Sequence, residues 1–298
     1  MKNLVSVGII LSALSASVCL NNAYAAFTNF EPGSTASIVG GTDVQADDPI
    51  ASTTVMLFGQ VTETDPKTGQ AQTGVYICTA SIISQDTLVS AGHCVAETLA
   101  APTDPTKLYV VFGQALPNGA VFGQTPFEQI IADPSVHPIY GYVAHPQWLG
   151  ADNQQALSQP DAHDISVIRF KGGLPQGYTT ATLLPADVTL QKGEEVTLAG
   201  YGITNAKTQD GAGTLRQVNV KVDGPYGQTE MAVAETAKHG SCSGDSGGPA
   251  FLNVNGQLQL WGATSRGNQD CTKDGIYTMI SAYTDFISQA QTQLEQLQ

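Results

Sequence analysis

The chain has 298 residues, of which 12 are Lys or Arg and 26 are Asp or Glu, and its formal net charge is −14. This acidity argues against a nucleic-acid partner, because phosphates attract a basic surface. Charged residues make up only 13% of the chain, against about 25% in an average soluble protein. With 42% hydrophobic residues the chain is not disordered, and it can form one large or two ordinary domains.

The first 25 residues differ in composition from the rest. Lys2 is their only charge, most of the segment is apolar, and Ala23-Tyr24-Ala25 is a small-x-small cleavage site. These features predict a secretory signal peptide over residues 1–25. Several serines interrupt the apolar run, which argues against a membrane anchor. Cys19 follows the large Val18, which argues against a lipid-attachment cysteine. We therefore expect an exported protein, periplasmic or extracellular, that is not attached to a membrane.

Four of the five cysteines lie beyond the predicted signal peptide: Cys78, Cys94, Cys242 and Cys271. An even number of cysteines in an exported chain indicates disulfide bonds. Four cysteines permit three pairings, and their number alone does not choose among them.

From Ile50 onward, short apolar or alternating runs are separated by Gly, Pro, Asn and Asp about every ten residues. Strands are predicted at residues 54–58, 74–79, 88–90, 108–112, 165–170, 195–199, 216–222, 258–263 and 276–280. Helical periodicity occurs only near the end, where a helix is predicted from about residue 284 with Thr284 and Asp285 as capping residues. The longest irregular segment is expected at residues 140–163. The pattern predicts an all-β protein with one C-terminal helix.

The most specific motif is Cys-Ser-Gly-Asp-Ser-Gly-Gly-Pro at residues 242–249. Hydrolysis of a peptide bond needs a nucleophile in a tight turn whose backbone N–H groups can bind an oxyanion. The glycines before and after Ser246 permit such a turn. Alone, this run is also compatible with an ordinary turn, so Ser246 is a candidate nucleophile that requires a base elsewhere in the chain.

Five histidines are candidates for that base. His93 lies just after a predicted apolar strand, separated from residues 87–91 by Gly92, and precedes Cys94, which would anchor its loop. The others lie before proline or in turn-like segments, which hold a base less firmly: His137, His145, His163 and His239. A carboxylate is also needed to fix the tautomer of the base. Asp164 opens the apolar run 165–170 and is the candidate, with a surface turn residue as the alternative.

Together these segments resemble the trypsin-like (chymotrypsin-fold) serine proteases, from Ile38 to about Ala290. The matching motifs are Ile-Val-Gly-Gly at 38–41, Ser-Ala-Gly-His-Cys at 90–94, Asp-Ile-Ser-Val-Ile at 164–168 and Gly-Asp-Ser-Gly-Gly-Pro at 244–249. Their order, His, Asp and Ser, is that of the family. The resemblance implies two six-stranded antiparallel β-barrels packed together with a C-terminal α-helix, and catalytic residues at the junction of the barrels.

The resemblance also implies a mechanism of acyl transfer. Ser246 would attack the scissile carbonyl while His93 takes its proton and later protonates the leaving amine, and Asp164 would orient His93. The N–H groups of Gly244 and Ser246 would form the oxyanion hole. Two disulfides beside the catalytic loops are implied as well: Cys78–Cys94 and Cys242–Cys271.

In the family, cleavage before the Ile-Val-Gly-Gly segment frees an amine that pairs with the aspartate preceding the nucleophile. Here that pair would be Ile38 and Asp245, with residues 26–37 as the propeptide and 38–298 as the protease domain. Ser37 departs from the family, because a basic residue usually precedes the cleavage site. We therefore expect an activating protease that accepts small residues.

The expected specificity pocket has no carboxylate at the position where trypsin carries one, since Gly240 stands six residues before Ser246. Together with glycine on the pocket walls, this favours an uncharged, open pocket for apolar or aromatic residues rather than for Lys or Arg. Arg266 replaces the usual aromatic residue of the segment that binds the substrate backbone; it is either a solvated rim charge or a cation that favours acidic substrates. The pocket residues implied are Gly240, Ser241, Ser265, Arg266, Gly267 and Gly275.

Two other functions remain open: a catalytically silent binding module of the same fold, and an esterase that uses the same acyl chemistry. The sequence contains no motif for a metal or a cofactor, and none is expected. The expected partners are a protein or peptide substrate and an activating protease, and we expect a monomer.

Overall fold

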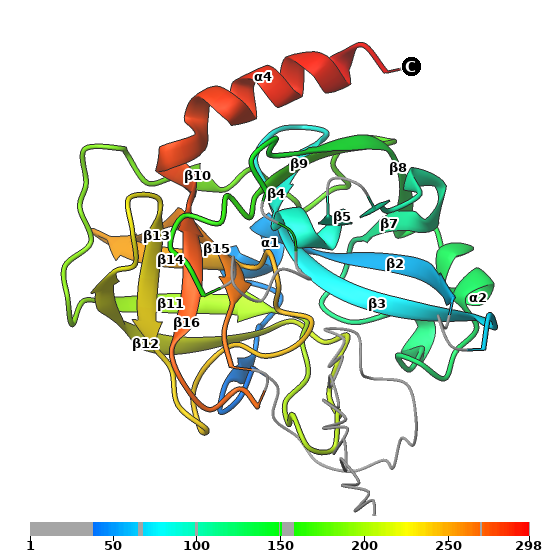
Figure 1. Cartoon of the computed structure of the whole chain (residues 1–298), viewed down its shortest axis with the longest axis horizontal. Coiled ribbons are helices and arrows are strands. Elements are labelled where there is room, and N and C mark those ends of the chain that lie inside the picture. Colours follow the sequence, from blue (N-terminus) through cyan, green and yellow to red (C-terminus); the bar gives the residue numbers. More distant parts are fainter. Residues whose placement is uncertain are drawn as a thin grey trace, which may run out of the picture.

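The computed structural model describes residues 38–64, 68–98, 101–148, 150, 158–268 and 270–297. The predicted signal peptide (1–25) and propeptide (26–37) lie outside the described residues. Within the described part, no helix is both long enough and apolar enough to cross a membrane. Most strands belong to two β-barrels, on the right and left of Figure 1.

The first barrel closes in the order β2-β3-β4-β9-β8-β7, and every neighbouring pair is antiparallel. Its strands are β2 (Thr54–Thr64), β3 (Ala71–Ile82), β4 (Thr87–Ser90), β7 (Leu108–Val111), β8 (Val136–Ala144) and β9 (Ser166–Phe170). A cluster of fully buried side chains fills its interior, including Val55, Leu57, Leu88, Val110 and Ile168.

The second barrel has the order β12-β11-β14-β15-β16-β13 and closes because β12 also pairs with β13. Its strands are β11 (Glu195–Gly200), β12 (Arg216–Pro225), β13 (Glu230–Ala234), β14 (Pro249–Val254), β15 (Gln257–Arg266) and β16 (Gly275–Met279). Two short strands extend this sheet: β1 (Thr42–Asp43) beside β12, and β10 (Thr182–Leu183) parallel to β15. The predicted fold, two six-stranded antiparallel barrels, is confirmed.

The remaining elements are short apart from the last helix. They are α1 (Pro49–Thr53), α2 (Phe127–Ile131), β5 (Ala96–Thr98), β6 (Ala101–Pro102) and 3₁₀ helices at Gly92–Cys94, Pro105–Lys107, Pro117–Gly119 and Ile280–Tyr283. Helix α4 (Thr284–Glu295) leaves the second barrel and crosses to the first (Figure 1), where Arg169 of β9 donates to the carbonyls of Leu294 and Leu297. The predicted capping role of Thr284 and Asp285 is wrong, because α4 continues directly from the last 3₁₀ helix and Tyr283 occupies the N-cap.

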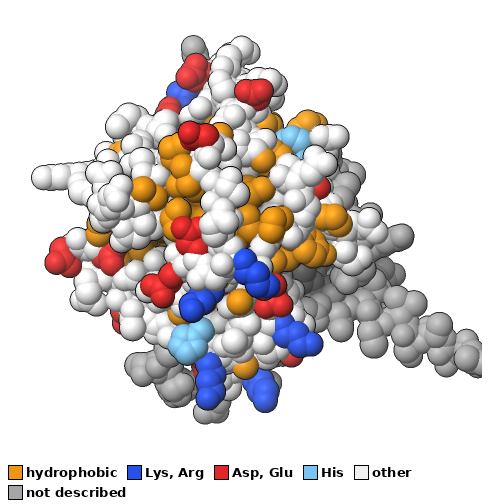
Figure 2. Space-filling model, turned by 90° about the vertical axis from the view of Figure 1, so that its left-hand side faces the viewer, with side chains coloured by type: hydrophobic (Ala, Val, Ile, Leu, Met, Phe, Trp, Pro, Cys, Tyr) orange, Lys and Arg blue, Asp and Glu red, His pale blue; other side chains and the backbone are white. Residues whose placement is uncertain are grey.

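A further apolar cluster joins the two barrels and α4. It contains buried side chains from both barrels and from the helix, including Phe58, Ile165, Tyr201, Phe251, Ile287 and Leu294. Burial of side chains of this size contributes about 1.5–3 kcal/mol each, so the barrels are held together by a substantial apolar interface. Outside this interior, Figure 2 shows charged side chains scattered among uncharged surface on one face, with most of its Lys and Arg gathered in the lower part of the view.

Three strands of the two barrels, β8, β13 and β14, were not predicted from the sequence, and neither were the short strands β1, β5, β6 and β10. Strand β8 contains Pro138 and Gly141, which interrupt a strand pattern, so the expected irregular segment 140–163 wrongly included its second half. Strand β13 begins at the charged Glu230 and has only four apolar residues after it, and β14 begins at Pro249 of the serine motif. In each case pairing with neighbouring strands outweighs the local sequence pattern.

Candidate active site

The predicted base and its carboxylate lie side by side at the junction of the barrels. His93 belongs to the 3₁₀ helix that follows β4, and Asp164 lies two residues before β9, which pairs with β4. Asp164 Oδ2 is 2.9 Å from His93 Nδ1, and Asp164 Oδ1 accepts the backbone N–H of His93 at 2.9 Å. The hydroxyl of Ser265, in β15 of the second barrel, donates to Oδ2 at 2.7 Å. Both carboxylate oxygens are therefore held in place.

Burial and charge act in opposite directions on this pair. Burial lowers the pKa of His93, but the charge and hydrogen bond of Asp164 raise it, and the net shift is upward from 6.5. Burial raises the pKa of Asp164, but His93 and the hydrogen bonds from Ser265 and the His93 backbone lower it, and the net shift is downward. Asp164 thus stays ionised and stabilises an imidazolium at His93, as a general base requires.

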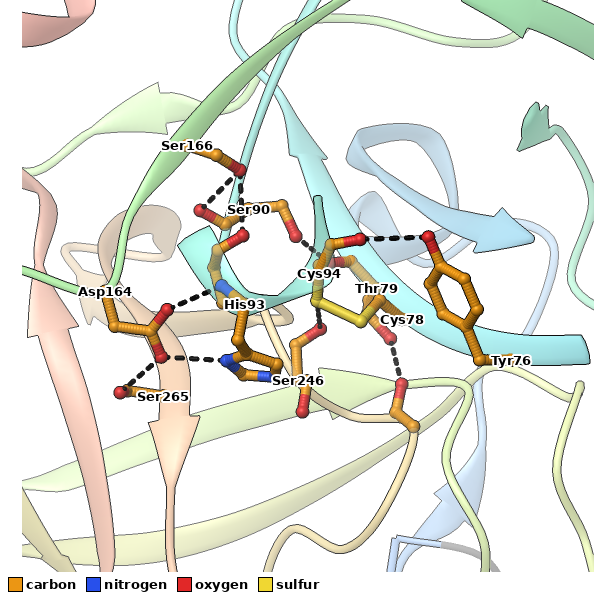
Figure 3. Close-up of a disulfide and its surroundings, with 12 residues drawn as sticks. Tyr76, Cys78, Thr79, Ser90, His93, Cys94, Asp164, Ser166, Ser246 and Ser265 are labelled. Atoms are coloured by element: carbon orange, nitrogen blue, oxygen red, sulfur yellow. Dashed lines mark hydrogen bonds and ion pairs between the residues drawn. A yellow bond between two sulfur atoms is a disulfide. The ribbon is translucent and has the colours of Figure 1, made fainter. Parts of the chain in front are cut away.

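The loop that carries Ser246 is held against the first barrel by Thr79 of β3. The Thr79 backbone N–H donates to the Ser246 carbonyl at 2.8 Å, and its hydroxyl donates to the Gly244 carbonyl at 3.0 Å. Figure 3 shows Ser246 and Asp164 on opposite sides of the His93 imidazole. The structure therefore brings the three predicted catalytic residues together, and it adds Thr79, which no sequence motif indicated.

The turn at Gly244 leaves two backbone donors available. Gly244 has a φ of +97°, and a Cβ there would lie 2.8 Å from the Gly202 Cα, so only glycine fits. The N–H groups of Asp245 and Gly247 donate to backbone carbonyls, whereas within the described part of the chain those of Gly244 and Ser246 donate to no protein group. The predicted oxyanion donors are thus unpaired, as binding of a substrate oxygen requires.

Two disulfides brace the loops of this site: Cys78–Cys94 and Cys242–Cys271. Both predicted pairings are confirmed. Among the described residues, one group has the composition and spacing of a metal site, namely Cys78, His93 and Cys94. Its two sulfurs are bonded to each other, so they are not thiolate ligands for a metal ion.

Comparison with known proteins identifies the family. The family model "Trypsin" matches residues 38–287, which is most of the chain. The chain belongs to the trypsin family. Similar proteins include kallikrein-8 of Homo sapiens, 29% identical over 163 residues, which cover 50% of this chain and 59% of that protein. The CLIP domain-containing serine protease B4 of Anopheles gambiae is 26% identical over 231 residues, covering 70% of this chain and 61% of that protein. The chain thus spans less than two thirds of these relatives.

In this trypsin-family chain, the two residues of the expected activation ion pair are buried, with Ile38 0% and Asp245 1% exposed. Asp245 accepts the backbone N–H groups of Gly202 and Cys242, each at 2.8 Å. Burial raises the pKa of Asp245 to about 7, although these two hydrogen bonds and the charge of Arg216 lower it. Burial thus outweighs the stabilising contacts of this carboxylate, and its ion pair with the amine of Ile38 stays a prediction.

The predicted pocket contains a carboxylate that the motifs did not reveal. Glu235 directly follows β13, is 6% exposed, and accepts a hydrogen bond from the Ser241 hydroxyl at 2.9 Å. Its side chain fills the space in front of Gly240 and Gly275, where a Cβ would lie 2.8 Å and 2.4 Å from Glu235 oxygens. A Cβ on Gly267 would instead meet its nearest atoms at 3.7 Å. The expectation of an uncharged, open pocket is therefore wrong beside Gly240 and Gly275, where the carboxylate of Glu235 lies.

The last two predicted pocket residues have other partners. Ser265 donates to Asp164, as described above. Arg266 forms a bidentate ion pair with Glu230, at 2.6 and 2.7 Å, and Glu230 is fully buried. Arg266 is thus neither a solvated rim charge nor an unpaired cation for acidic substrates. The sequence did not indicate this pair because the two residues are far apart along the chain.

Proposed function

We propose that this chain is a secreted serine endopeptidase, periplasmic or extracellular, made as a zymogen. The observation that carries the proposal is the hydrogen-bonded set of Ser265, Asp164 and His93, with the Ser246 loop held beside it by Thr79. Membership of the trypsin family supports protein substrates. A binding module of the same fold needs neither an oriented base nor unpaired oxyanion donors.

The proposed reaction proceeds through an acyl-enzyme. His93 takes the proton of the Ser246 hydroxyl as the oxygen attacks the scissile carbonyl carbon, and the Gly244 and Ser246 N–H groups stabilise the resulting oxyanion. Asp164 stabilises the imidazolium, which then protonates the leaving amine. Water hydrolyses the acyl-enzyme by the same steps. Loss of one oxyanion donor costs about 3 kcal/mol of transition-state stabilisation.

Activation is proposed to follow cleavage between Ser37 and Ile38. The new amine of Ile38, a residue that is already buried, would pair with Asp245, whose buried carboxylate has a pKa raised to about 7. An adjacent ammonium group lowers such a pKa and relieves the cost of burial. Because Asp245 lies between the two oxyanion donors, this pair would fix the turn that they form. Because Ser37 precedes this bond, the activating protease would have to accept serine at that position.

The test combines labelling with sequencing. The activated protein is treated with a serine-directed phosphonate, and its N-terminus and its cleavage of a peptide library are determined. We expect a label on Ser246, an N-terminus at Ile38, and peptide hydrolysis. No label would favour the binding module, a label with turnover of esters alone would favour the esterase, and an active enzyme beginning elsewhere would reject the activation step.

A further inference from the structure

Glu235 is a buried carboxylate that the proposed mechanism does not use. Its Oε1 accepts hydrogen bonds from the Tyr277 hydroxyl at 2.6 Å and from the Ser241 hydroxyl at 2.9 Å, and its Oε2 lies 3.2 Å from the same Ser241 oxygen. Ser241 lies five residues before the nucleophile, and Tyr277 belongs to β16. These contacts hold the carboxylate between the chain leading into Ser246 and the strand that follows Cys271.

The glycines around Glu235 are required by its position. A Cβ at Gly240 would lie 2.8 Å from both the Cβ and Oε2 of Glu235, and one at Gly275 would lie 2.4 Å from Oε1. Contacts below 3 Å force a shift of the neighbouring atoms. Gly240 thus has no room for the acidic side chain that its place in the chain would otherwise allow, because Glu235 already brings a carboxylate there.

No protein cation neutralises this carboxylate within the described part of the chain. Its hydrogen-bond donors are the neutral groups of Ser241 and Tyr277, and the charge that acts on it is that of Asp245, which is negative. Burial raises the pKa of Glu235 to about 7, although the hydrogen bonds from Tyr277 and Ser241 lower it. A buried carboxylate in these surroundings gains most from a cation that arrives with a ligand.

We propose that Glu235 forms the charged floor of the primary specificity pocket, so that the enzyme cleaves after Lys or Arg. This inference rests on the proposed protease function, because it assigns the substrate class of the same site. In this proposal, the side chain of the residue whose carbonyl carbon reaches Ser246 would lie against residues 240–243 and the segment joined to them by the Cys242–Cys271 disulfide. An ammonium or guanidinium group there would form charge-assisted hydrogen bonds to Glu235.

An apolar substrate side chain would not compensate Glu235. It would remove water from the mouth of the pocket and leave the carboxylate without a partner, or force it to take a proton. An acidic side chain would add repulsion between like charges. Glu235 would therefore disfavour substrates with apolar or acidic side chains and favour substrates with a cationic side chain.

The experiment compares chromogenic peptides that differ only in the residue before the scissile bond, with Lys, Arg, Phe, Leu or Glu at that position. Activated wild-type enzyme is expected to prefer Lys or Arg over every uncharged residue by at least about 100-fold in kcat/KM. Glu235→Gln keeps the size of the side chain and removes its charge, so this preference should fall by at least about 100-fold. Glu195→Gln, the same change at an exposed residue of β11, is the matched control and should behave as wild type.

A relocated carboxylate distinguishes a charge effect from misfolding. In the double variant Glu235→Gly/Gly240→Asp the clash between the two Cβ atoms is absent, and an acid stands six residues before Ser246. It should regain a preference for Lys or Arg over Phe of at least about 10-fold relative to Glu235→Gln. Labelling by an uncharged phosphonate reports the fraction of molecules with an intact Ser246 in every variant.

The outcomes separate the two proposals. If wild-type enzyme is labelled at Ser246 but prefers Phe, Leu or Glu, or if Glu235→Gln retains the wild-type preference, the specificity inference is rejected and the protease proposal stands. If neither labelling nor hydrolysis occurs, both are rejected.

Discussion

The buried ion pair of Arg266 and Glu230 leads to a quantitative prediction about stability. Glu230 is 0% exposed, and Arg266 donates to both of its oxygens, at 2.6 and 2.7 Å. The same carboxylate accepts the backbone N–H groups of Asp161 and Ala162, at 2.9 and 3.1 Å. Arg266→Met removes the only cation paired with it in the described structure while retaining an apolar stem of similar length.

The magnitude follows from burial. Removal of one partner of a buried ion pair leaves an uncompensated charge and costs about 3–5 kcal/mol. The two backbone donors to Glu230 remain, so we expect the lower part of this range, about 3 kcal/mol. That is a large share of a total stability of about 5–15 kcal/mol. The exposed pair of Lys192 and Asp223 provides a matched comparison, because Lys192→Met should change stability too little to measure.

Equilibrium unfolding in urea measures both changes. All chains carry Ser246→Ala so that self-digestion does not distort the transition, and free energies are compared at pH 7. If Arg266→Met and Lys192→Met destabilise the protein equally, the buried pair does not make the contribution inferred from its geometry. Glu230→Gln combined with Arg266→Met should recover most of the loss, since no buried charge is then left unpaired.

Three further predictions concern the active site. Asp164→Asn should lower kcat by about 10⁴-fold, because His93 loses the group that fixes its tautomer. The test measures the turnover rate per molecule of enzyme that reacts with the phosphonate, and a loss below tenfold would contradict the prediction. With a Lys or Arg substrate, the ratio of kcat/KM between wild-type enzyme and Glu235→Gln should shrink as the pH falls below about 7, where Glu235 takes a proton and loses its charge. The groups around Glu235 are the hydroxyls of Ser241 and Tyr277 and the charge of Asp245, and the protonation of His93 affects both enzymes alike. A ratio that does not change with pH from 5 to 8 would exclude this ionisation. Gly275→Ala places a Cβ 2.4 Å from Glu235 Oε1, so kcat/KM for Lys or Arg substrates should fall about 10- to 100-fold. Steady-state kinetics measure this change. Unchanged kcat/KM values would show that cleavage after Lys or Arg does not depend on the observed position of Glu235.

The sequence was sufficient wherever the signal is local. Alternating apolar residues marked most barrel strands, and the serine and histidine motifs identify residues that the structure brings together around Asp164. Strand β8 was not predicted because its Pro138 and Gly141 are tolerated only through pairing with β7 and β9. Local patterns thus identify elements whose own residues determine them.

The carboxylate of Glu235 in the predicted pocket could not be inferred from local sequence patterns, because it is placed there by contacts between distant segments. The sequence predicted a pocket without an acid because Gly240 stands at the position where trypsin carries its carboxylate. Glu235 is only five residues upstream, but its relation to the pocket depends on Gly275 and Tyr277, which the fold brings beside it. A glutamate directly after the apolar residues 231–234 was the available signal. Arg266 was misjudged for the same reason, since Glu230 neutralises it through the pairing of distant segments.

The contact of Thr79 with the serine loop has a consequence for the newly synthesised chain. Thr79, His93 and Asp164 precede Ser246 in the sequence, so every strand of the first barrel is synthesised before Ser246. The loop of Ser246 is held by hydrogen bonds from Thr79, so the observed shape of this loop depends in part on the contact between the two barrels. We therefore expect docking of the two barrels to be required, in addition to the proposed cleavage before Ile38, for the observed arrangement of Ser246 beside His93.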